Sequence, residues 1–348
     1  MNVWKFDHVM ELDGQKLTKA YIKSLSKEQR EALVEPIFQM IRKDLPEFPY
    51  PDDLSKVDKE WLRVLAYKPD LTTDEVFNNS NLGTAICKYF CHDYFKSKGE
   101  KDKRSMPQLF EDDEIMRKLI WNRLSIGWFE EENGGETFNL SPKMIIQGMR
   151  SMRLIAGITM QKITVAKYLA EKYSELGDIV YDYSCGFGGR LLGAVSCGRK
   201  YTGADPLTVP DLERMVEYLK LTGVTLIQSG SEDYCGDENS IDFSYSSPPY
   251  ASKERYSEDL SQAYNKDTDY FFNIYWKKTL ENIKYMLKPN KWFGLILTNQ
   301  PLMLSLAEEQ FGEPIEIIKL RTVRNHLNKA QGNEITKFEP CYMFKNVK

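Results

Sequence analysis

The sequence contains no apolar run long enough to cross a membrane, because its most apolar stretches, such as Trp292–Leu297, have only the length of a strand. The amino terminus, MNVWKFDHVMELDG, has neither the basic flank nor the long apolar core of a signal peptide. Six cysteines without regular spacing do not form a disulfide framework. Together these absences predict a globular protein that stays in the cytoplasm with reduced thiols.

Positive charge is not in excess either, since 47 Lys and Arg stand against 51 Asp and Glu, a formal net charge of -4. This balance excludes a uniformly basic nucleic-acid coat protein, but it leaves room for a local basic groove. The 348 residues are enough for about two domains with a sizeable core. No internal repeat and no low-complexity tract is present.

Residues 1–140 are predicted to form a mostly helical domain. Ser26-Lys27-Glu28-Gln29 is a capping-box pattern, and apolar residues at helical spacing follow it as far as Ile41. Further helices are expected from Asp58 onward, over Gly83–Phe95 and over Asp112–Leu124. The polar, glycine-containing run Glu130–Thr137 is predicted to be the linker to the next domain.

Residues 141–348 are predicted to form an α/β domain, because short apolar runs alternate there with helical patterns. The expected strands are 179–181, 200–203, 225–228, 241–245 and 293–298, and the expected helices are 163–173, 191–196, 211–221 and 271–287. Ile315–Leu320 and Glu339–Phe344 predict an antiparallel closing pair. The expected fold is therefore a Rossmann-like, mainly parallel sheet with helices on both faces, preceded by the helical domain.

A glycine-rich loop, Asp182–Arg190 (DYSCGFGGR), lies between the first expected strand and a helix. Glycine allows a sharp turn and a close approach to a ligand, and ligands bind at the carboxyl ends of strands in such sheets. The loop lacks the Gly-Lys-Ser/Thr of a Walker motif, and Arg190 with the two following leucines breaks the pyrophosphate fingerprint. A nucleoside without a pyrophosphate, such as S-adenosylmethionine, fits this pattern; a tight turn that binds nothing is the alternative.

Acidic residues follow the next two expected strands. Asp205, 19 positions after Gly186, ends one strand and has the spacing of a carboxylate that accepts both ribose hydroxyls. Gly230-Ser231-Glu232-Asp233 ends the other strand and is placed to reach an adenine ring. Each acid alone is readily explained as a solvated loop carboxylate, but their recurrence at successive strand ends favours a binding site.

The stretch Ser247-Pro248-Pro249-Tyr250 ends the fourth expected strand. Two prolines lack N–H donors and fix φ, so they make a rigid, extended corner. The Ser247 hydroxyl and the Pro248 carbonyl then offer two acceptors for an exocyclic amino group, and Tyr250 offers a face on which a flipped base can stack. A simple strand-ending turn is the alternative interpretation.

With these motifs, the chain from about Pro142 to its carboxyl end resembles the DNA amino-methyltransferases, which make N6-methyladenine or N4-methylcytosine from S-adenosylmethionine. Asp182–Gly189 resembles the D-P-F-x-G-x-G-T loop of that family, and Gly186–Ala194 is similar to phage-borne DNA methyltransferases. The resemblance implies that the catalytic residues are Ser247, Pro248, Pro249 and Tyr250, and that the cofactor-binding residues are Asp182, Ser184, Gly186, Phe187, Gly188, Asp205, Ser231 and Asp233. It implies S-adenosylmethionine as the cofactor and DNA as the partner.

The sequence departs from the family pattern at several places. Tyr183-Ser184-Cys185 replaces P-F-x, and Gly189 stands where threonine is common. Serine at 247 is more usual in the N4-cytosine enzymes, although it is not confined to them. Only 61 positions separate Gly186 from Ser247, which leaves no space between them for a recognition domain. The resemblance therefore implies a permuted motif order, with target recognition outside the core, in the helical amino-terminal half.

Basic and aromatic residues outside these motifs are candidates for contact with DNA. Residues 319–329 include four Lys or Arg and no acid, and Arg150 and Arg153 precede the core. The candidates are Arg150, Arg153, Tyr256, Arg321, Arg324 and Lys329, with Tyr264 as a second aromatic residue near the base. A solvated surface is the alternative for each basic residue.

Cys87-x-x-x-Cys91-His92 is a single cluster without a second ligand pair, so it is interpreted as core packing, and no metal is expected. Two other functions stay open besides DNA methylation. One is amino-group methylation of RNA or of a protein glutamine, and the other is a non-catalytic nucleic-acid-binding module that retains the fold.

Overall fold

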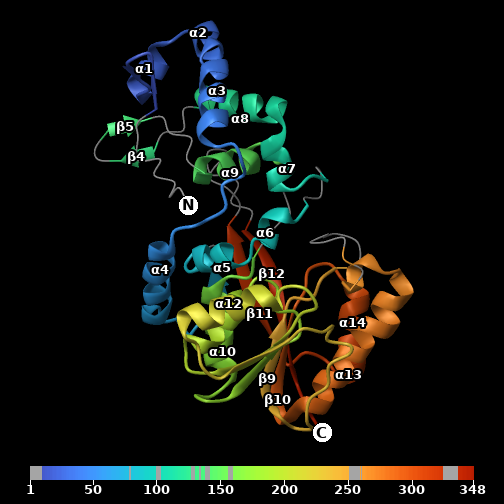
Figure 1. Cartoon of the computed structure of the whole chain (residues 1–348). Helices are drawn as coiled ribbons and strands as arrows, with labels where there is room; N and C mark the ends of the chain where they lie inside the picture. The colour runs from blue at the N-terminus through green and yellow to red at the C-terminus, as the bar shows by residue number, and fades with distance from the viewer. Residues whose placement is uncertain are drawn as a thin grey trace. The chain divides into compact units, whose positions relative to one another are not determined.

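The computed structural model describes residues 10–77, 80–98, 103–126, 130–132, 135–137, 142–155, 160–250, 259, 261–323 and 336–348 (Figure 1). The chain divides into two compact units, of which the first comprises residues 1–52 and 93–158 and the second comprises residues 53–92 and 159–348. The second unit thus takes in a segment of the amino-terminal half. The proposed boundary near residue 140 and the recognition role of the first 140 residues remain predictions.

The first unit is mostly helical, as its sequence pattern predicts. Its helices are α1 (Lys19–Ser24), α2 (Lys27–Ala32), α3 (Val34–Asp44), α6 (Asp93–Lys96), α7 (Met106–Glu111), α8 (Asp113–Ile126) and α9 (Pro142–Ser151). The capping box at Ser26 is confirmed, because its hydroxyl accepts from the Gln29 N–H while the Gln29 side chain accepts from the Ser26 N–H. The single helix expected up to Ile41 is divided at Leu33 into α2 and α3.

Two short antiparallel hairpins complete this unit: β1 (Glu11–Leu12) pairs with β2 (Gln15–Lys16), and β4 (Glu130–Glu132) pairs with β5 (Gly135–Thr137). The prediction that Glu130–Thr137 is a linker is therefore wrong. The run pairs with itself, Glu130 with Thr137 and Glu132 with Gly135, and lies inside the first unit and not between the two units.

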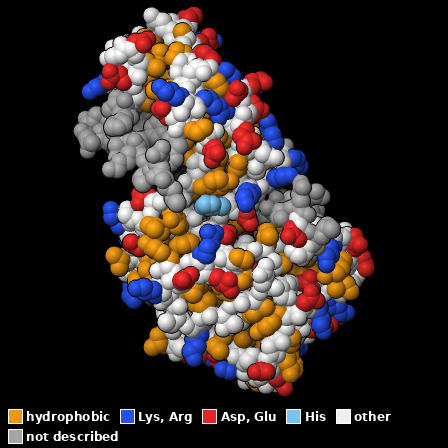
Figure 2. Space-filling model, in the orientation of Figure 1, with side chains coloured by type: hydrophobic (Ala, Val, Ile, Leu, Met, Phe, Trp, Pro, Cys, Tyr) orange, Lys and Arg blue, Asp and Glu red, His pale blue; other side chains and the backbone are white. Residues whose placement is uncertain are grey.

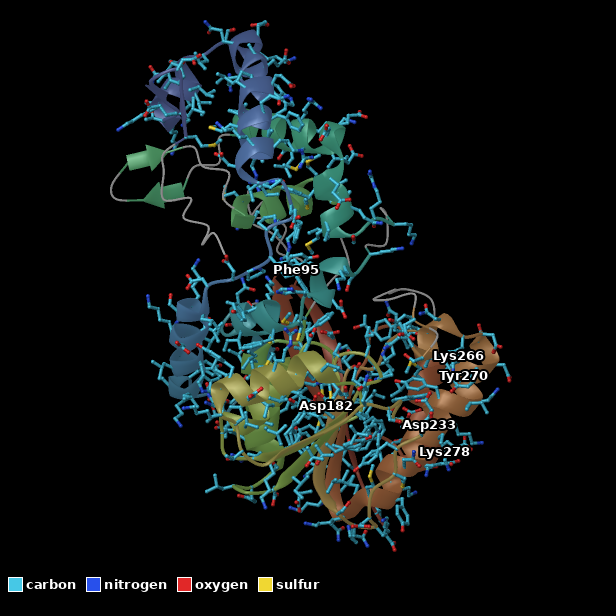
Figure 3. All side chains as sticks on the ribbon, viewed as in Figure 1. Phe95, Asp182, Asp233, Lys266, Tyr270 and Lys278 are labelled. Atoms are coloured by element: carbon cyan, nitrogen blue, oxygen red, sulfur yellow. The ribbon has the colours of Figure 1, made fainter. Side chains whose placement is uncertain are left out.

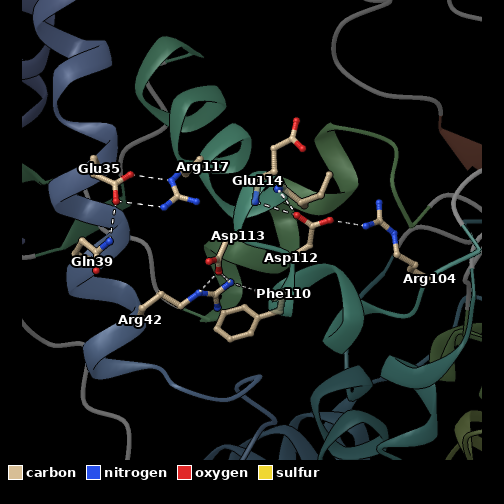
Figure 4. A network of polar contacts seen from close by, with 10 residues as sticks. Glu35, Gln39, Arg42, Arg104, Phe110, Asp112, Asp113, Glu114 and Arg117 are labelled. Atoms are coloured by element: carbon tan, nitrogen blue, oxygen red, sulfur yellow. Dashed lines mark hydrogen bonds and ion pairs between the residues drawn. The ribbon is translucent and has the colours of Figure 1, made fainter.

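An ion-pair network joins α3 to α8 within the first unit (Figure 4). Arg117 donates two hydrogen bonds to Glu35, from Nε at 2.8 Å and Nη2 at 3.2 Å, and Gln39 donates a third at 2.7 Å. Arg42 donates to Asp113 at 3.0 Å and to the Phe110 carbonyl at 2.6 Å. These contacts lie beside the buried apolar face of α3, which consists of Ile37, Phe38 and Ile41.

The second unit is built on an eight-stranded sheet with the order β3-β11-β12-β10-β9-β6-β7-β8. The strands are β3 (Glu75–Phe77), β6 (Ile179–Asp182), β7 (Lys200–Ala204), β8 (Val224–Ile227), β9 (Ile241–Ser246), β10 (Leu287–Ile296), β11 (Glu316–Val323) and β12 (Thr336–Lys345). Only the pairs of β12 with β10 and β11 are antiparallel. The predicted fold class, a Rossmann-like and mainly parallel α/β sheet with a closing antiparallel pair, is confirmed.

Helices cover both faces of this sheet. The helices of the second unit are α4 (Leu54–Ala66), α5 (Thr84–Phe90), α10 (Ile163–Tyr173), α11 (Gly189–Val195), α12 (Val209–Leu219), the 3-10 turn η1 (Ala263–Asn265), the π-helix η2 (Tyr270–Trp276), α13 (Lys277–Met286) and α14 (Pro301–Phe311). On one face, η2, α13 and α14 pack on β10 and β12 through a core that includes Trp276, Phe293 and Phe344. On the other face, the Tyr245 hydroxyl donates to the Ala166 carbonyl of α10. Every residue of β9 is consequently buried, as expected of a central parallel strand.

The structure differs from several of the expected elements of this unit. The strand β3, only three residues long, adds in parallel to β11 inside the region expected to be helical. Asp53 rather than Asp58 caps α4, by accepting from the Ser55 N–H at 3.0 Å. The helix expected over 271–287 begins as a π-helix at Tyr270. Within the described part of the chain, no helix has the length and apolar character needed to span a bilayer.

Candidate functional site

The strand order places the sequence motifs together, at the end of the sheet where the parallel strands have their carboxyl termini. The parallel strands β9, β6, β7 and β8 are neighbours in this order, so their carboxyl ends lie together. The chain runs from β6 through β7 to β8 on one side and then returns to β9 on the other side of β6. Ligands of open α/β sheets bind at this kind of reversal, outside the carboxyl ends of the strands. The glycine loop follows β6 and Ser247–Tyr250 follows β9, so the two motifs flank the reversal.

Backbone geometry explains the glycines of the loop. Gly186 has φ +53° and Gly188 has φ +81°, a left-handed region that costs residues with a side chain about 1–2 kcal/mol. A Cβ on Gly189 would lie 2.4 Å from the carbonyl oxygen of Gln161. This contact explains why the chain has glycine where threonine is common in the family that it resembles.

Asp182 is fully buried and accepts four hydrogen bonds. Its Oδ2 accepts from Arg190 Nε and from the Tyr201 hydroxyl, both at 2.7 Å. Its Oδ1 accepts from the Ser246 hydroxyl at 2.7 Å and from the Ser184 N–H at 3.2 Å. Asp182 thus connects the glycine loop to the end of β9, through bonds that occupy its carboxylate.

Arg190 is the counter-charge of this carboxylate and is only 5% exposed. Burial lowers the pKa of Arg190, but the Asp182 carboxylate and the Tyr201 hydroxyl outweigh that effect and hold it above its ordinary value. Arg190 also donates to the Ser184 carbonyl, which ties the first turn of α11 back onto the loop. The arginine that breaks the pyrophosphate fingerprint therefore has a structural partner inside the fold.

Asp205 joins the glycine loop to the turn after β7. Its carboxylate accepts from the N–H groups of Gly186 at 3.1 Å, Leu207 at 2.9 Å and Thr208 at 3.0 Å. Burial raises the pKa of Asp205, and these three donors oppose that effect. Because a carboxylate has about four lone-pair positions, Asp205 can accept a further hydrogen bond from a ligand hydroxyl.

The Ser247–Tyr250 corner is anchored at both ends. The Ser246 carbonyl accepts from the Tyr183 hydroxyl at 3.4 Å. The Tyr250 hydroxyl accepts from the Thr298 N–H at 2.9 Å, just beyond the end of β10. Pro248 is buried, whereas Ser247, Pro249 and Tyr250 are partly exposed. The corner is held by neighbouring strands while part of its surface stays open to solvent.

The turn after β8 is held by α13. The Asn282 side-chain amide donates to the carbonyls of Ser231, Glu232 and Tyr234 at 3.0–3.1 Å. Ser231 is buried, and its hydroxyl shares a hydrogen bond with that of Thr279. Asp233, expected to contact adenine, is exposed, whereas Glu232 beside it is 6% exposed.

The residues that the sequence analysis missed are Glu232, Asn282, Tyr270 and Tyr275. Glu232 lies inside the predicted motif Gly230–Asp233, but the sequence does not show which of the two adjacent acids is buried. Tyr270 and Tyr275 lie in the π-helix, which no periodicity in the sequence marks.

The candidates for DNA contact are distributed over the two units. Arg150 of α9 donates to the Tyr94 hydroxyl, and Arg153 is exposed just after α9, both in the first unit. Arg321 is a partly buried residue of β11 in the second unit. Tyr264 is buried in the core beside η2. Tyr256, Arg324 and Lys329 lie outside the described residues. On the face in Figure 2, basic and acidic side chains are interspersed.

Cys87 and Cys91 are fully buried, and burial raises the pKa of the Cys87 thiol to about 12. The Cys91 thiol lies 3.7 Å from the carbonyl oxygen of Phe187, so the cysteine packs directly against the glycine loop. Among the residues that the structure describes, no three His, Cys, Asp or Glu side chains are grouped to hold a metal ion.

Comparison with solved structures gives several methyltransferases. The chain is similar to the 1,6-didemethyltoxoflavin N1-methyltransferase of Burkholderia thailandensis, with 12% identity and a TM-score of 0.37 over 53% of this chain and 78% of that one. The N-methyltransferase NodS of Bradyrhizobium japonicum has 12% identity and a TM-score of 0.37, over 53% and 94%. The geranyl diphosphate C-methyltransferase of Streptomyces coelicolor has 13% identity and a TM-score of 0.39, over 57% and 81%.

A scan against protein-family models gives no match, and a search of curated proteins likewise finds none. The fold assignment therefore depends on the strand order itself.

Proposed function

We propose that the protein is an S-adenosylmethionine-dependent methyltransferase that acts on an exocyclic amino group of a DNA base, N6 of adenine or N4 of cytosine. The observation that carries this proposal is the placement of the two motifs on opposite sides of the reversal between β6 and β9, with the Asp182–Ser246 hydrogen bond joining them. A glycine loop suited to a nucleoside and a corner suited to an amino group then serve the same site.

The residues at this edge of the sheet fit such a cofactor. The left-handed glycines allow close approach of the backbone, and Ser184, Gly186, Phe187 and Gly188 would hold the methionine end. Asp205 would accept from the ribose hydroxyls, and the turn Ser231–Asp233 lies at the base end. Asp182 acts on this site by shaping the loop. When bound, S-adenosylmethionine supplies a methyl group on a positively charged sulfur, which needs no metal for activation.

The Ser247–Tyr250 corner would hold the amino group that receives the methyl. The Ser247 hydroxyl and the Pro248 carbonyl accept the two amino hydrogens and so orient the nitrogen lone pair. Neither Pro248 nor Pro249 offers an N–H donor that would compete with them. Tyr250 stacks on the extruded base, and the hydrogen bond from Thr298 fixes its ring. Positioning of this kind supplies most of the rate enhancement.

The proposal of DNA as the partner rests on the resemblance of the corner to DNA amino-methyltransferases. Arg321 in the second unit and Arg150 and Arg153 in the first unit would contact phosphates. The first 140 residues would carry target recognition, because the permuted motif order leaves no space for it inside the core.

Methyl transfer from labelled S-adenosylmethionine to DNA, RNA and protein, assayed in parallel, tests the proposal. We expect label in DNA, and its loss in Pro248→Ala and Tyr250→Ala. Pro289→Ala and Tyr285→Ala, at exposed positions of β10 and α13, are the matched controls and should keep activity. Label in RNA or in protein alone would contradict the proposed substrate, and lack of binding to the cofactor would contradict the enzyme itself.

A further inference from the structure

One face of the sheet carries aromatic and basic side chains on its strands β11 and β12. Residues that pair across an antiparallel ladder point to the same face. Phe338 of β12 pairs with Arg321 of β11. Two residues further along, Pro340 pairs with Lys319. The alternation continues along β12 to Phe344, which lies in the core beneath η2, α13 and α14. All five residues are therefore on the face that these helices cover in part.

Burial on this face changes along β12. Phe344 is fully buried, whereas Phe338 on the same strand and the same face is 41% exposed. Figure 3 shows the covered side of the sheet, where Tyr270 of η2 and Lys278 of α13 are labelled. Lys319 is exposed as well. The ring of Phe338 and the ammonium of Lys319 therefore lie beyond the cover of the helices.

Two cations lie beside the exposed ring of Phe338. Lys319 Nζ is 5.8 Å from the centre of the ring, near the limit of a cation–π contact, and Arg321 is the cross-strand neighbour of the ring. On its other side, Lys319 is in register with Glu75 of the edge strand β3. A nucleotide presents a flat π-face together with a negatively charged phosphate, so a ring beside two cations suits it. An apolar protein surface would instead have to desolvate the cations.

This surface is continuous with the Ser247–Tyr250 corner. The Leu297 N–H donates to the Pro340 carbonyl at 3.2 Å. The next residue, Thr298, donates its N–H to the Tyr250 hydroxyl at 2.9 Å. Because β10 and β11 are both antiparallel to β12, their carboxyl ends lie at the same end of the sheet as the corner. β11 is two strand spacings from β10, about 10 Å, which is the length of about three stacked bases.

An exposed ring on a sheet face can stack only on a base that has left the duplex. Both faces of a paired base are covered by its neighbours, whereas an unpaired base offers a face to an aromatic side chain. We propose that Phe338 and Lys319 bind an unpaired nucleotide about three positions from the target base, the ring by stacking and the ammonium through a phosphate. This inference rests on the proposed function, which supplies DNA as the polymer. It adds a second contact and the strand state of the DNA at that contact.

Fluorescence anisotropy of labelled oligothymidylate with the full-length protein tests this inference without any methyl transfer. A strand of about 20 nucleotides exceeds the ~4–16 nucleotides that single-strand sites of this kind cover. Phe338→Ala should weaken its binding by about 5- to 150-fold, the factor that stacking on one ring contributes. An abasic strand of the same length and charge, and a blunt duplex, should bind this variant as they bind the wild type. Phe338→Trp keeps an aromatic face and should keep the affinity for oligothymidylate.

Two further variants separate the charge from the ring. Lys319→Ala should lower the salt dependence of oligothymidylate binding by about 0.7 units of slope, the value of one phosphate contact on a single strand. Ile317→Ala is the matched control, because Ile317 is 47% exposed on the same face but lies further from the carboxyl end of β11. This variant should change neither the affinity nor the slope. All these variants should keep the thermal unfolding midpoint of the wild type, since the side chains that they change are exposed.

Several results would overturn the inference. An equal loss of affinity for the abasic strand or for the duplex in Phe338→Ala would show that the ring does not stack on an unpaired base. Tighter binding of oligouridylate RNA, with the same dependence on Phe338, would show that DNA is the wrong polymer. A dimer that Phe338→Ala dissociates, with oligothymidylate affinity unchanged, would make this face a contact between two copies of the chain.

Methylation assays separate this inference from the proposed function. If DNA is methylated but oligothymidylate binding does not depend on Phe338, the inference is wrong and the proposed function stands. If oligothymidylate binding depends on Phe338 but DNA receives no methyl group, the binding site stands and the proposed reaction is wrong.

Discussion

The hydroxyl of Ser246 donates a hydrogen bond to Oδ1 of Asp182 over 2.7 Å, and so links the last residue of β9 to the last residue of β6. The same carboxylate receives the guanidinium of Arg190, which opens the helix after the glycine loop. A buried charge thus sets the relative positions of the proposed cofactor loop and the proposed catalytic corner. A rigid link of this kind provides the pre-organisation that methyl transfer by positioning requires.

Asp182→Asn should destabilise the protein strongly. The substitution keeps the shape of the side chain but leaves Arg190 buried without a counter-charge, which costs about 3–5 kcal/mol in comparable cases. Urea unfolding of the variant measures this loss. Glu114→Gln, which breaks the exposed pair with Lys118, should cost less than about 1 kcal/mol. Equal stability of Asp182→Asn and the wild type would contradict the structural role of the carboxylate.

Tyr250→Phe and Tyr250→Ala should separate the hydroxyl from the ring. Phenylalanine keeps the stacking face and loses only the hydrogen bond from Thr298, so kcat/KM for DNA should fall modestly. Alanine also removes base stacking, which is worth about 1–3 kcal/mol per base, or about 5- to 150-fold. The Kd for S-adenosylhomocysteine should not change in either variant. Equal losses in the two variants would show that the ring does not stack on the base.

Gly189→Ala should destabilise the second unit. The new Cβ would lie 2.4 Å from the Gln161 carbonyl oxygen, and a backbone atom cannot move aside as the end of a flexible side chain can. Overpacking of this kind costs about 1–3 kcal/mol. A thermal unfolding midpoint equal to that of the wild type would contradict the packing described for the glycine loop.

The Glu35–Arg117 pair should give the first unit an acid-sensitive contribution to stability. A hydrogen bond from Arg117, and to a smaller extent one from Gln39, lowers the pKa of Glu35 from 4.5 to about 2. Since the folded pKa is lowered, the contribution is complete above pH 4.5 and is lost as the pH falls toward 2. The difference in unfolding free energy between wild type and Glu35→Gln should be constant near neutral pH and shrink over that window. A difference that grows on acidification would contradict the pairing.

Arg321→Ala and Arg153→Ala should each weaken binding to DNA, and by the same factor for every DNA sequence. Removal of one phosphate contact reduces the salt dependence of binding by about one unit of slope. Fluorescence titration with a DNA duplex at several salt concentrations measures this slope. Arg63→Ala, at an exposed position paired with Glu60, is the control and should leave the slope unchanged. An unchanged slope in both test variants would show that these arginines do not contact DNA phosphates.

The parts of the fold that the sequence predicts are those with strong local signals. The strands β6, β7 and β9 are short apolar runs between turn residues, and their predicted bounds match within about two residues. The three residues of β3 have too little pattern to be separated from their helical surroundings, because only the pairing with β11 makes them a strand. The Glu130–Thr137 run has the composition of a linker and of a hairpin alike.

The candidate site shows the same limit. Gly186, Asp205 and Ser247 could be placed at strand ends because each strand was recognised first. Which of Glu232 and Asp233 is buried depends instead on the empty space beside Gly230 and on a tyrosine about 40 residues away in the chain. Contacts of that kind have no local signature, so only the three-dimensional arrangement shows them.

The most direct test of the central claim is mass spectrometry of nucleosides from DNA treated with the purified protein and S-adenosylmethionine carrying a deuterated methyl group. The account predicts deuterated N6-methyladenine or N4-methylcytosine, present with the wild type and absent with Pro248→Ala. If the protein binds the cofactor but the nucleosides of the treated DNA carry no label, the proposed DNA methylation is contradicted.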